Sequence, residues 1–209
     1  MYFILMGDIV GSSEKKGATL MTSFKSVIQS ANGNFSKQIL SPLTITLGDE
    51  FQGVVKDLRS VVDIIFYIDK ALIGTNPEFR IRYSMLYGPI DTPVNKENAH
   101  GMLGEGLTKA RKGLEEMKPK KLHYRMVTTD GKTDDMLNGL FRLYDSFYSD
   151  WSKNDREYLE RFFEKDDYKW VGEQLSKDPS TVWRKRISLK LDEFNIAKDL
   201  IRSTANAFE

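Results

Sequence analysis

The stretch from Leu43 to Val55 constrains the fold most, because it has the pattern of two short strands joined by a tight turn. Its first half alternates leucine or isoleucine with threonine, which is the period of a half-buried strand. Gly48 and Asp49 supply turn residues, and a second apolar segment follows Glu50. The pattern predicts a β-hairpin with two carboxylates, Asp49 and Glu50, at its tip.

A further acid lies near the N-terminus, where the apolar residues 2–6 lead through Gly7 into Asp8. If this strand is a neighbour of the hairpin, Asp8 and Asp49 converge. Proteins hold Mg²⁺ through one or two carboxylates together with substrate phosphates. We therefore expect a magnesium (or manganese) site. Asp49 as an ordinary turn residue and Asp8 as a helix cap are the alternatives that the sequence leaves open.

The loop after Asp8 contains the small residues Gly11, Ser12 and Ser13. Small side chains let backbone N–H groups approach an anion, and the helix expected over residues 17–39 presents its N-terminus to that anion. The loop, together with Gly48 of the hairpin, is a candidate nucleotide-binding segment. A turn with a serine helix cap is the alternative.

The remaining periodicity predicts an α+β fold with the element order strand, helix, strand, strand, helix, strand, helix, strand. The first six elements match the ferredoxin-like βαββαβ arrangement, with an antiparallel sheet and helices packed on one face. After the hairpin, we expect helices over residues 57–73, 104–117 and 134–147, and strands over residues 79–87 and 122–129.

The helix expected over residues 104–117 carries Lys109, Arg111 and Lys112, and Lys118 follows it as a further basic residue. Beside a carboxylate site, these side chains would hold a triphosphate. In an enzyme the first three would be catalytic, because they would stabilise charge that develops on phosphate oxygens. A solvated helix face is the simpler alternative.

The 209 residues carry a net charge of +1 and include no cysteine, which excludes disulfides and thiolate chemistry. No run of about 18 apolar residues occurs, so we expect no membrane insertion and a cytoplasmic location.

The composition changes at Trp151, and we expect two domains, residues 1–150 and 151–209. The second is expected to be all-α, with a helix–turn–helix formed by residues 167–175, a short turn, and a helix that begins near Ser180. Twelve basic and twelve acidic residues make this segment neutral, so a motif used only for dimerisation or partner docking is the alternative to DNA binding. The candidate DNA contacts are Thr181, Arg184, Lys185 and Lys190.

Four segments together resemble a known family. Asp8–Ser12 resembles the first-strand signature of class III nucleotidyl cyclases, and Gly48–Phe51 resembles the hairpin of those enzymes and of diguanylate (GGDEF) cyclases. Arg82–Pro89 resembles their later strand, and Gly104–Lys112 their following helix. The whole chain is similar to the SatD family of bacterial proteins, and its helix–turn–helix is similar to that of sigma factors.

The cyclase resemblance implies that Asp8 and Asp49 bind two metal ions, that the backbone of Ile9 contributes, and that Glu50 assists. It also implies a homodimer. The chain departs from the cyclase pattern at the base-reading position, where Ile45 replaces a lysine. No frame of the helix over residues 104–117 supplies both the asparagine and the arginine of the active enzymes.

These observations predict a regulatory protein that binds magnesium and a nucleoside triphosphate or cyclic nucleotide, and that passes this state to DNA through its helix–turn–helix. The alternative is an active nucleotidyl cyclase or nucleotidyltransferase, a phosphorus–oxygen lyase whose C-terminal helices serve assembly or partner docking. A docking module that has lost ligand binding is the third possibility.

Overall fold

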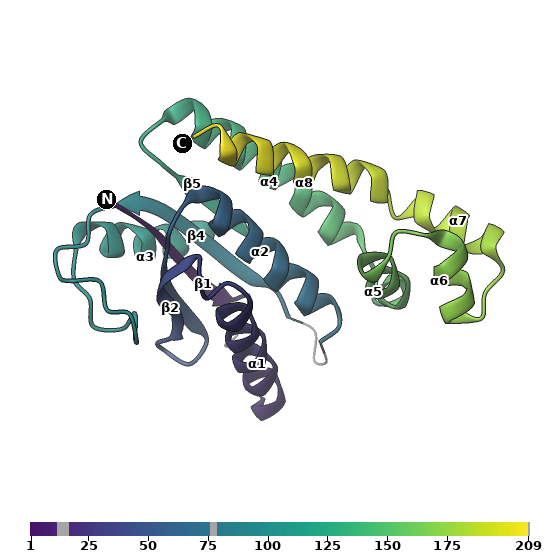
Figure 1. Ribbon diagram of the computed structural model, residues 1–209, viewed down its shortest axis with the longest axis horizontal. Coiled ribbons are helices and arrows are strands. Elements are labelled where there is room, and N and C mark those ends of the chain that lie inside the picture. Colours follow the sequence, from purple (N-terminus) through teal and green to yellow (C-terminus); the bar gives the residue numbers. More distant parts are fainter. Residues whose placement is uncertain (12–16, 76–78, 209) are drawn as a thin grey trace.

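The computed structural model describes residues 1–11, 17–75 and 79–208, and its centre is a five-stranded sheet with helices on both faces (Figure 1). The strand order is β2-β3-β1-β4-β5. The strands are β1 (Tyr2–Ile9), β2 (Ile39–Ile45), β3 (Glu50–Val55), β4 (Ile81–Gly88) and β5 (Tyr124–Val127).

The first four strands, with α1 (Ala18–Asn34) and α2 (Leu58–Ile73), form the expected βαββαβ unit. β1 lies between β3 and β4 and runs antiparallel to both. The predicted hairpin is present, because β2 and β3 pair antiparallel and Gly48 takes a positive φ of 87° in the connection.

The expectation of a wholly antiparallel sheet is wrong at β5, which pairs parallel to β4. The chain reaches β5 through α3 (Glu105–Met117), and a helical crossover of this kind returns the next strand in the same direction. The sheet is therefore mixed, and α3 covers the face opposite to α1 and α2 (Figure 1).

α3 begins in very close contact with the end of β4. A Cβ atom added at Gly106 would lie 2.6 Å from the carbonyl oxygen of Pro89, so only glycine permits this approach. Beyond it, Leu107, Ala110 and Leu114 pack on Ile4 and other apolar side chains of the sheet. The close approach at Gly106 and this apolar packing hold α3 in place above the strands.

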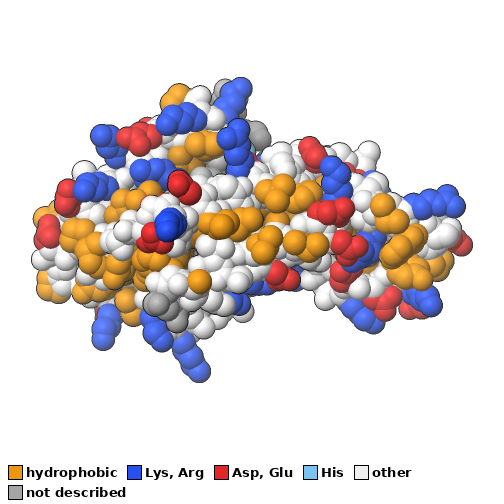
Figure 2. Space-filling view, turned by 90° about the horizontal axis from the view of Figure 1, so that it is seen from above, with side chains coloured by type: hydrophobic (Ala, Val, Ile, Leu, Met, Phe, Trp, Pro, Cys, Tyr) orange, Lys and Arg blue, Asp and Glu red, His pale blue; other side chains and the backbone are white. Residues whose placement is uncertain are grey.

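The main core lies on the other face and includes the last helix of the chain. α4 (Gly131–Asp150) and α8 (Leu191–Asn206) lie side by side over this face (Figure 1). Phe194, Ala197 and Ile201 of α8 are buried in the same core as the side chains of α1 and α2. The C-terminal segment therefore packs, through α8, against the first 150 residues. Seen from above, the α4–α8 surface carries exposed apolar side chains (Figure 2), among them Met136, Leu143, Ile196 and Leu200.

Between α4 and α8, the turn η1 (Lys153–Asp155) leads into α5 (Arg156–Glu164), α6 (Tyr168–Leu175) and α7 (Pro179–Ser188). These helices close over a smaller core of Leu159, Phe162, Val171 and Val182. The expected helices of this segment are thus present. No described helix has both the length and the apolar character needed to cross a membrane.

A buried acid, Asp69 of α2, lies within this architecture and is 3% exposed. Its carboxylate accepts hydrogen bonds from the hydroxyls of Tyr83 at 2.9 Å, Tyr124 at 2.8 Å and Tyr144 at 3.2 Å. Burial raises the pKa of Asp69 to about 6, although these hydroxyls oppose the rise. The folded chain therefore holds a proton on Asp69 more tightly than the unfolded chain does.

We predict that Asp69 makes folding less favourable as the pH rises. Its contribution is fully present below about pH 4 and is lost as the pH rises through about 6, by on the order of 3 kcal/mol at roughly 1.4 kcal/mol per pKa unit. Urea unfolding between pH 4 and 7 should show this loss in the wild type and not in Asp69→Asn. The exposed Asp135→Asn is the control, and parallel profiles for all three proteins would contradict the prediction.

Candidate functional site

The end of β1 brings acidic and basic side chains together on the face that α3 covers. Asp8 pairs in register with Glu50 of β3 and with Arg82 of β4. Residues that are directly opposite across neighbouring strands point to the same face. Asp8, Glu50 and Arg82 therefore form a row across the three central strands, and we call these residues, with Arg111 and Lys118, the Asp8 cluster.

The row is built on a buried ion pair. Nη1 of Arg82 donates to both carboxylate oxygens of Asp8, at 2.8 and 2.9 Å, and the two side chains are 8% and 5% exposed. Nε of Arg82 donates to the carbonyl oxygen of Leu122 at 3.2 Å, which holds the guanidinium in place. Burial raises the pKa of Asp8, while Arg82 and Lys118 act in the opposite direction.

The second layer of the Asp8 cluster comes from α3 and the residue after it. Nη2 of Arg111 lies 3.2 Å from Oε2 of Glu50, and Nζ of Lys118 lies 3.6 Å from Oδ2 of Asp8. Both cations are about half exposed, in contrast to Arg82. Lys118 also donates to the carboxylate of Glu115 at 2.7 Å, so three cations meet three carboxylates here and the charges balance.

This arrangement does not fit a divalent metal ion. Both oxygens of Asp8 already accept from Arg82, and the nearby acids Glu50 and Glu115 pair with Arg111 and Lys118. Within residues 1–11, 17–75 and 79–208, no group of three acidic or histidine side chains is arranged to hold a metal. An anion such as phosphate suits the cluster better, because guanidinium and ammonium groups bind it through charge-assisted hydrogen bonds.

Asp49 lies beside β1 through its backbone, since the N–H of Ile9 donates to its carbonyl oxygen at 3.0 Å. Asp49 lines a pocket of about 490 Å³ with Gly48 and the start of α1 (Ala18). The carboxylate that the strand register places next to Asp8 is therefore that of Glu50. Of the expected loop residues, Gly11 lies in a turn with φ 72°, and Ser12 and Ser13 fall outside the described residues.

The three basic residues expected on α3 have different surroundings. Lys109 pairs with Glu105 at 2.7 Å, and Lys112 lies 3.8 Å from Glu116; both lysines are exposed. Only Arg111 of the three reaches the carboxylates at the strand ends. The spacing within the helix explains this, because residues 109 and 112 lie on a different side of α3 from residue 111.

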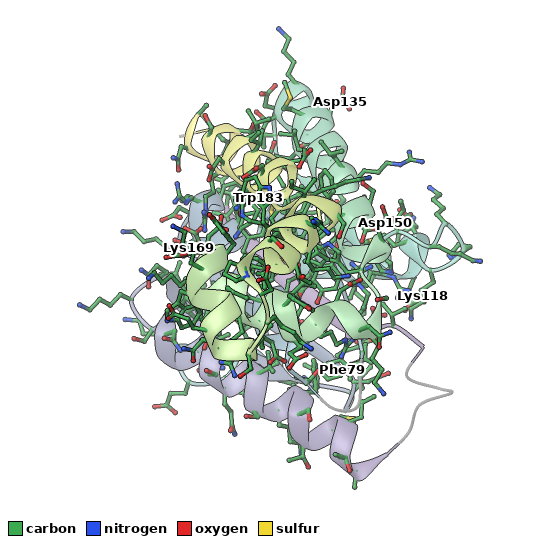
Figure 3. All side chains as sticks on the ribbon, turned by 90° about the vertical axis from the view of Figure 1, so that its right-hand side faces the viewer. Phe79, Lys118, Asp135, Asp150, Lys169 and Trp183 are labelled. Atoms are coloured by element: carbon green, nitrogen blue, oxygen red, sulfur yellow. The ribbon has the colours of Figure 1, made fainter. Side chains whose placement is uncertain are left out.

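The candidate DNA contacts lie on and after α7, which follows α6 after three residues (176–178). Asp178 caps α7 by accepting from the N–H of Ser180 at 2.8 Å. Thr181, Arg184 and Lys190 are exposed, whereas Lys185 forms an ion pair with Asp155. Figure 3 views the molecule from the end formed by these helices, where the half-exposed Trp183 is labelled.

A model of the SatD family matches residues 2–198 of the chain. The chain belongs to the SatD family.

Two solved structures are similar to this SatD family member over about half of its length. One is that of adenylate cyclases from Trypanosoma brucei in their monomeric state, with a TM-score of 0.42, 13% identity, and coverage of 52% of this chain and 64% of that one. The other is a bacterial light-regulated adenylyl cyclase, with a TM-score of 0.42, 17% identity, and coverage of 58% and 41%. TM-scores this low do not bear on function. No curated protein matches the chain.

Two members of the Asp8 cluster, Arg82 and Lys118, are basic residues that the sequence offers for phosphate contact but does not place next to Asp8. Arg82 alternates with apolar residues in a strand and has the pattern of an exposed charge, yet it is 7% exposed. Its place opposite Asp8 follows from strand order and register, which the sequence of this SatD family chain does not specify. Lys118 follows α3 directly and reaches Asp8 because the glycine contacts of α3 fix the helix position.

We predict that Arg82→Met destabilises the chain by about 3–5 kcal/mol, because it leaves the carboxylate of Asp8 buried without its partner. The double variant Asp8→Asn/Arg82→Met should be more stable than Arg82→Met, since no charge then remains unpaired. Urea unfolding of the three proteins measures both effects. A loss below about 1 kcal/mol in Arg82→Met would show that the pair is not a structural anchor.

Proposed function

We propose that this SatD family chain binds a nucleoside triphosphate through its phosphates at the Asp8 cluster, and that it acts as a regulatory protein. The observation that carries the proposal is a pair of half-exposed cations at the strand ends. Arg111 and Lys118 are half exposed above a buried Asp8–Arg82 pair. A polyphosphate would bind these two cations in place of Glu50 and the exposed Glu115.

The contacts of Arg111 and Lys118 leave both side chains able to bind such a ligand. Lys118 lies 3.6 Å from Asp8, beyond hydrogen-bond distance for an ammonium and a carboxylate, and Arg111 is 3.2 Å from Glu50. Lys118 also donates to the exposed carboxylate of Glu115 at 2.7 Å, so a phosphate would replace Glu115 as its partner. Rotation of either exposed side chain toward a phosphate would leave the Asp8–Arg82 anchor intact.

The nucleoside part of the proposal comes from the resemblance of Asp8–Ser12 and Gly48–Phe51 to cyclase segments. Class III cyclases bind their metal ions through carboxylates at the positions of Asp8 and Asp49, and here Asp8 is engaged by Arg82. This pairing favours nucleotide binding over efficient cyclisation. A cyclase or nucleotidyltransferase is the second candidate, and it requires Asp8 to exchange Arg82 for a metal ion.

The regulatory part of the proposal assigns DNA binding to α6 and α7. The three-residue connection and the exposed Thr181 and Arg184 near the start of α7 support this assignment. Lys190, exposed at the N-terminus of α8, would contact phosphate. Lys185 would contribute only if it left Asp155.

We predict that at least one of ATP, GTP, CTP and UTP binds the wild-type chain, and that the affinity falls more than tenfold in Arg111→Gln/Lys118→Gln. Each lost charge-assisted contact costs about 1.5–3 kcal/mol. Isothermal titration with magnesium, and separately with a chelator, measures the affinity and its dependence on the metal. Mass spectrometry of the products distinguishes a cyclase from a binding protein.

The matched control is Lys109→Gln/Lys112→Gln, which removes the same charge from α3 at positions away from the cluster. Its affinity should stay within about twofold of wild type. Absence of binding with all four nucleotides, or an equal loss in both double variants, would contradict the proposal.

We predict that a DNA selection with the full chain enriches a defined sequence, and that Arg184→Gln weakens binding to it. One bidentate arginine–base contact is worth about 1–3 kcal/mol, so the affinity should fall roughly tenfold. Fluorescence anisotropy with the selected duplex measures the change, and Lys169→Gln, exposed on α6, is the control. Selection of no sequence, with or without nucleotide, would leave α6 and α7 without a DNA role.

A further inference from the structure

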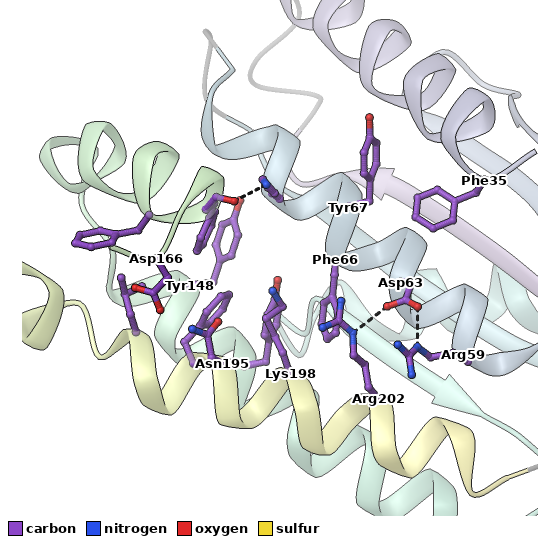
Figure 4. Close-up of a pocket in the computed structure, with 16 residues that line it drawn as sticks. Phe35, Arg59, Asp63, Phe66, Tyr67, Tyr148, Asp166, Asn195, Lys198 and Arg202 are labelled. Carbon is purple, nitrogen blue, oxygen red and sulfur yellow. Dashed lines mark hydrogen bonds and ion pairs between the residues drawn. The ribbon is translucent and has the colours of Figure 1, made fainter. Parts of the chain in front are cut away.

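A second concave surface lies on the opposite face of the sheet from the Asp8 cluster. It is a cleft of about 630 Å³ between α2, α8 and the end of α5 (Figure 4), and we call it the α2–α8 groove. This volume is in the range of pockets that hold small organic molecules. Polar and apolar side chains both line the groove.

The groove contains more positive than negative charge. Its cationic side chains are Arg59, Lys70, Lys198 and Arg202, and its acids are Asp63 and Asp166.

Both acids are already paired with arginines. Asp63 accepts from Arg59 at 2.7 Å and from Arg202 at 2.9 Å, as the dashed lines in Figure 4 show. Asp166 accepts from Arg186 of α7 at 2.7 and 2.8 Å. Lys70 donates to the carbonyl oxygen of Phe163 at 2.6 Å, and neither Lys70 nor Lys198 has a carboxylate partner among the described residues of the groove.

Among these groups, Lys198 gives the strongest indication of an anion site. It extends from α8 into the groove (Figure 4), is half-buried, and has no carboxylate within ion-pair distance among the described residues. Its ammonium lies 5.4 Å from the ring centre of Phe66 and 5.5 Å from that of Phe194. Burial lowers the pKa of Lys198, and Arg202 and Lys70 lower it further, against Asp199 and Asp63. A bound anion would relieve this repulsion.

Aromatic side chains supply the apolar part of the lining. Tyr67 and Phe35 meet edge to face with ring centres 5.5 Å apart, and the buried Phe66 and the partly buried Tyr148 also line the groove. Such walls favour a planar ring, which stacks on one aromatic side chain and meets the edge of another.

We propose that the α2–α8 groove binds a small organic anion with an aromatic ring, the anionic group at Lys198 and Lys70 and the ring against Phe66 and Tyr67. This site is separate from the Asp8 cluster and independent of the proposed nucleotide site. Because α2 packs on the sheet and α8 follows α7, such a ligand would bridge the first part of the chain and the C-terminal helices. It would therefore bias how those helices pack.

The test uses two fluorescent probes that differ in charge, 8-anilinonaphthalene-1-sulfonate and its uncharged parent N-phenyl-1-naphthylamine. We expect saturable one-to-one binding of the sulfonate to the full wild-type chain. Lys198→Gln should raise the dissociation constant of the sulfonate about tenfold and that of the uncharged probe less than twofold. Lys25→Gln, an exposed position on α1, should change neither, and Arg111→Gln/Lys118→Gln should leave sulfonate binding intact.

Phenyl phosphate and benzoate then compete with the sulfonate and distinguish a phosphate ligand from a carboxylate. Displacement by either supports the proposal. No saturable sulfonate binding, an equal effect of Lys198→Gln on both probes, or displacement by neither competitor would overturn it. A thermal melt of Lys198→Gln checks folding, and its Tm should equal or exceed that of wild type, since the substitution removes a half-buried charge.

Discussion

The buried pair of Asp8 and Arg82 is the interaction on which the candidate site depends. It joins the two central strands, and its burial keeps both charged groups in one geometry. Buried charges of opposite sign are costly to separate, so the pair keeps its position beneath the more exposed side chains. The half-exposed Arg111 and Lys118 above it, paired with Glu50 and Glu115, are the groups that would exchange partners. A rigid buried ion pair beneath two cations that can change partners is a physical basis for anion binding.

Strand patterns and turn residues predict much of the fold. The alternation before Gly48 specifies the hairpin, and the apolar face of α2 specifies a buried helix. The direction of β5 was not predicted, because no local pattern encodes whether a strand joins its sheet parallel or antiparallel. The packing of α8 into the main core also depends on contacts far apart in the sequence, such as those of Phe194.

The candidate site was predicted in part, for the same reason. Acids at strand ends are visible in the sequence, and so is the basic character of α3. Register decides which of them meet, and it places Glu50 beside Asp8 and Arg82 opposite. The α2–α8 groove has no sequence motif at all, because Lys198 and Phe66 come from helices more than a hundred residues apart. The excess of positive charge in the groove arises only when α2 and α8 pack together.

The central claim is that the Asp8 cluster receives a polyphosphate. The most direct measurement is side-chain ¹⁵N NMR of the arginine guanidinium groups during titration with inorganic triphosphate. The account predicts a saturable shift of the Arg111 signal, with little change at Arg82, which stays bound to Asp8. No shift at Arg111, or shifts confined to Arg59 and Arg202 of the α2–α8 groove, would contradict it.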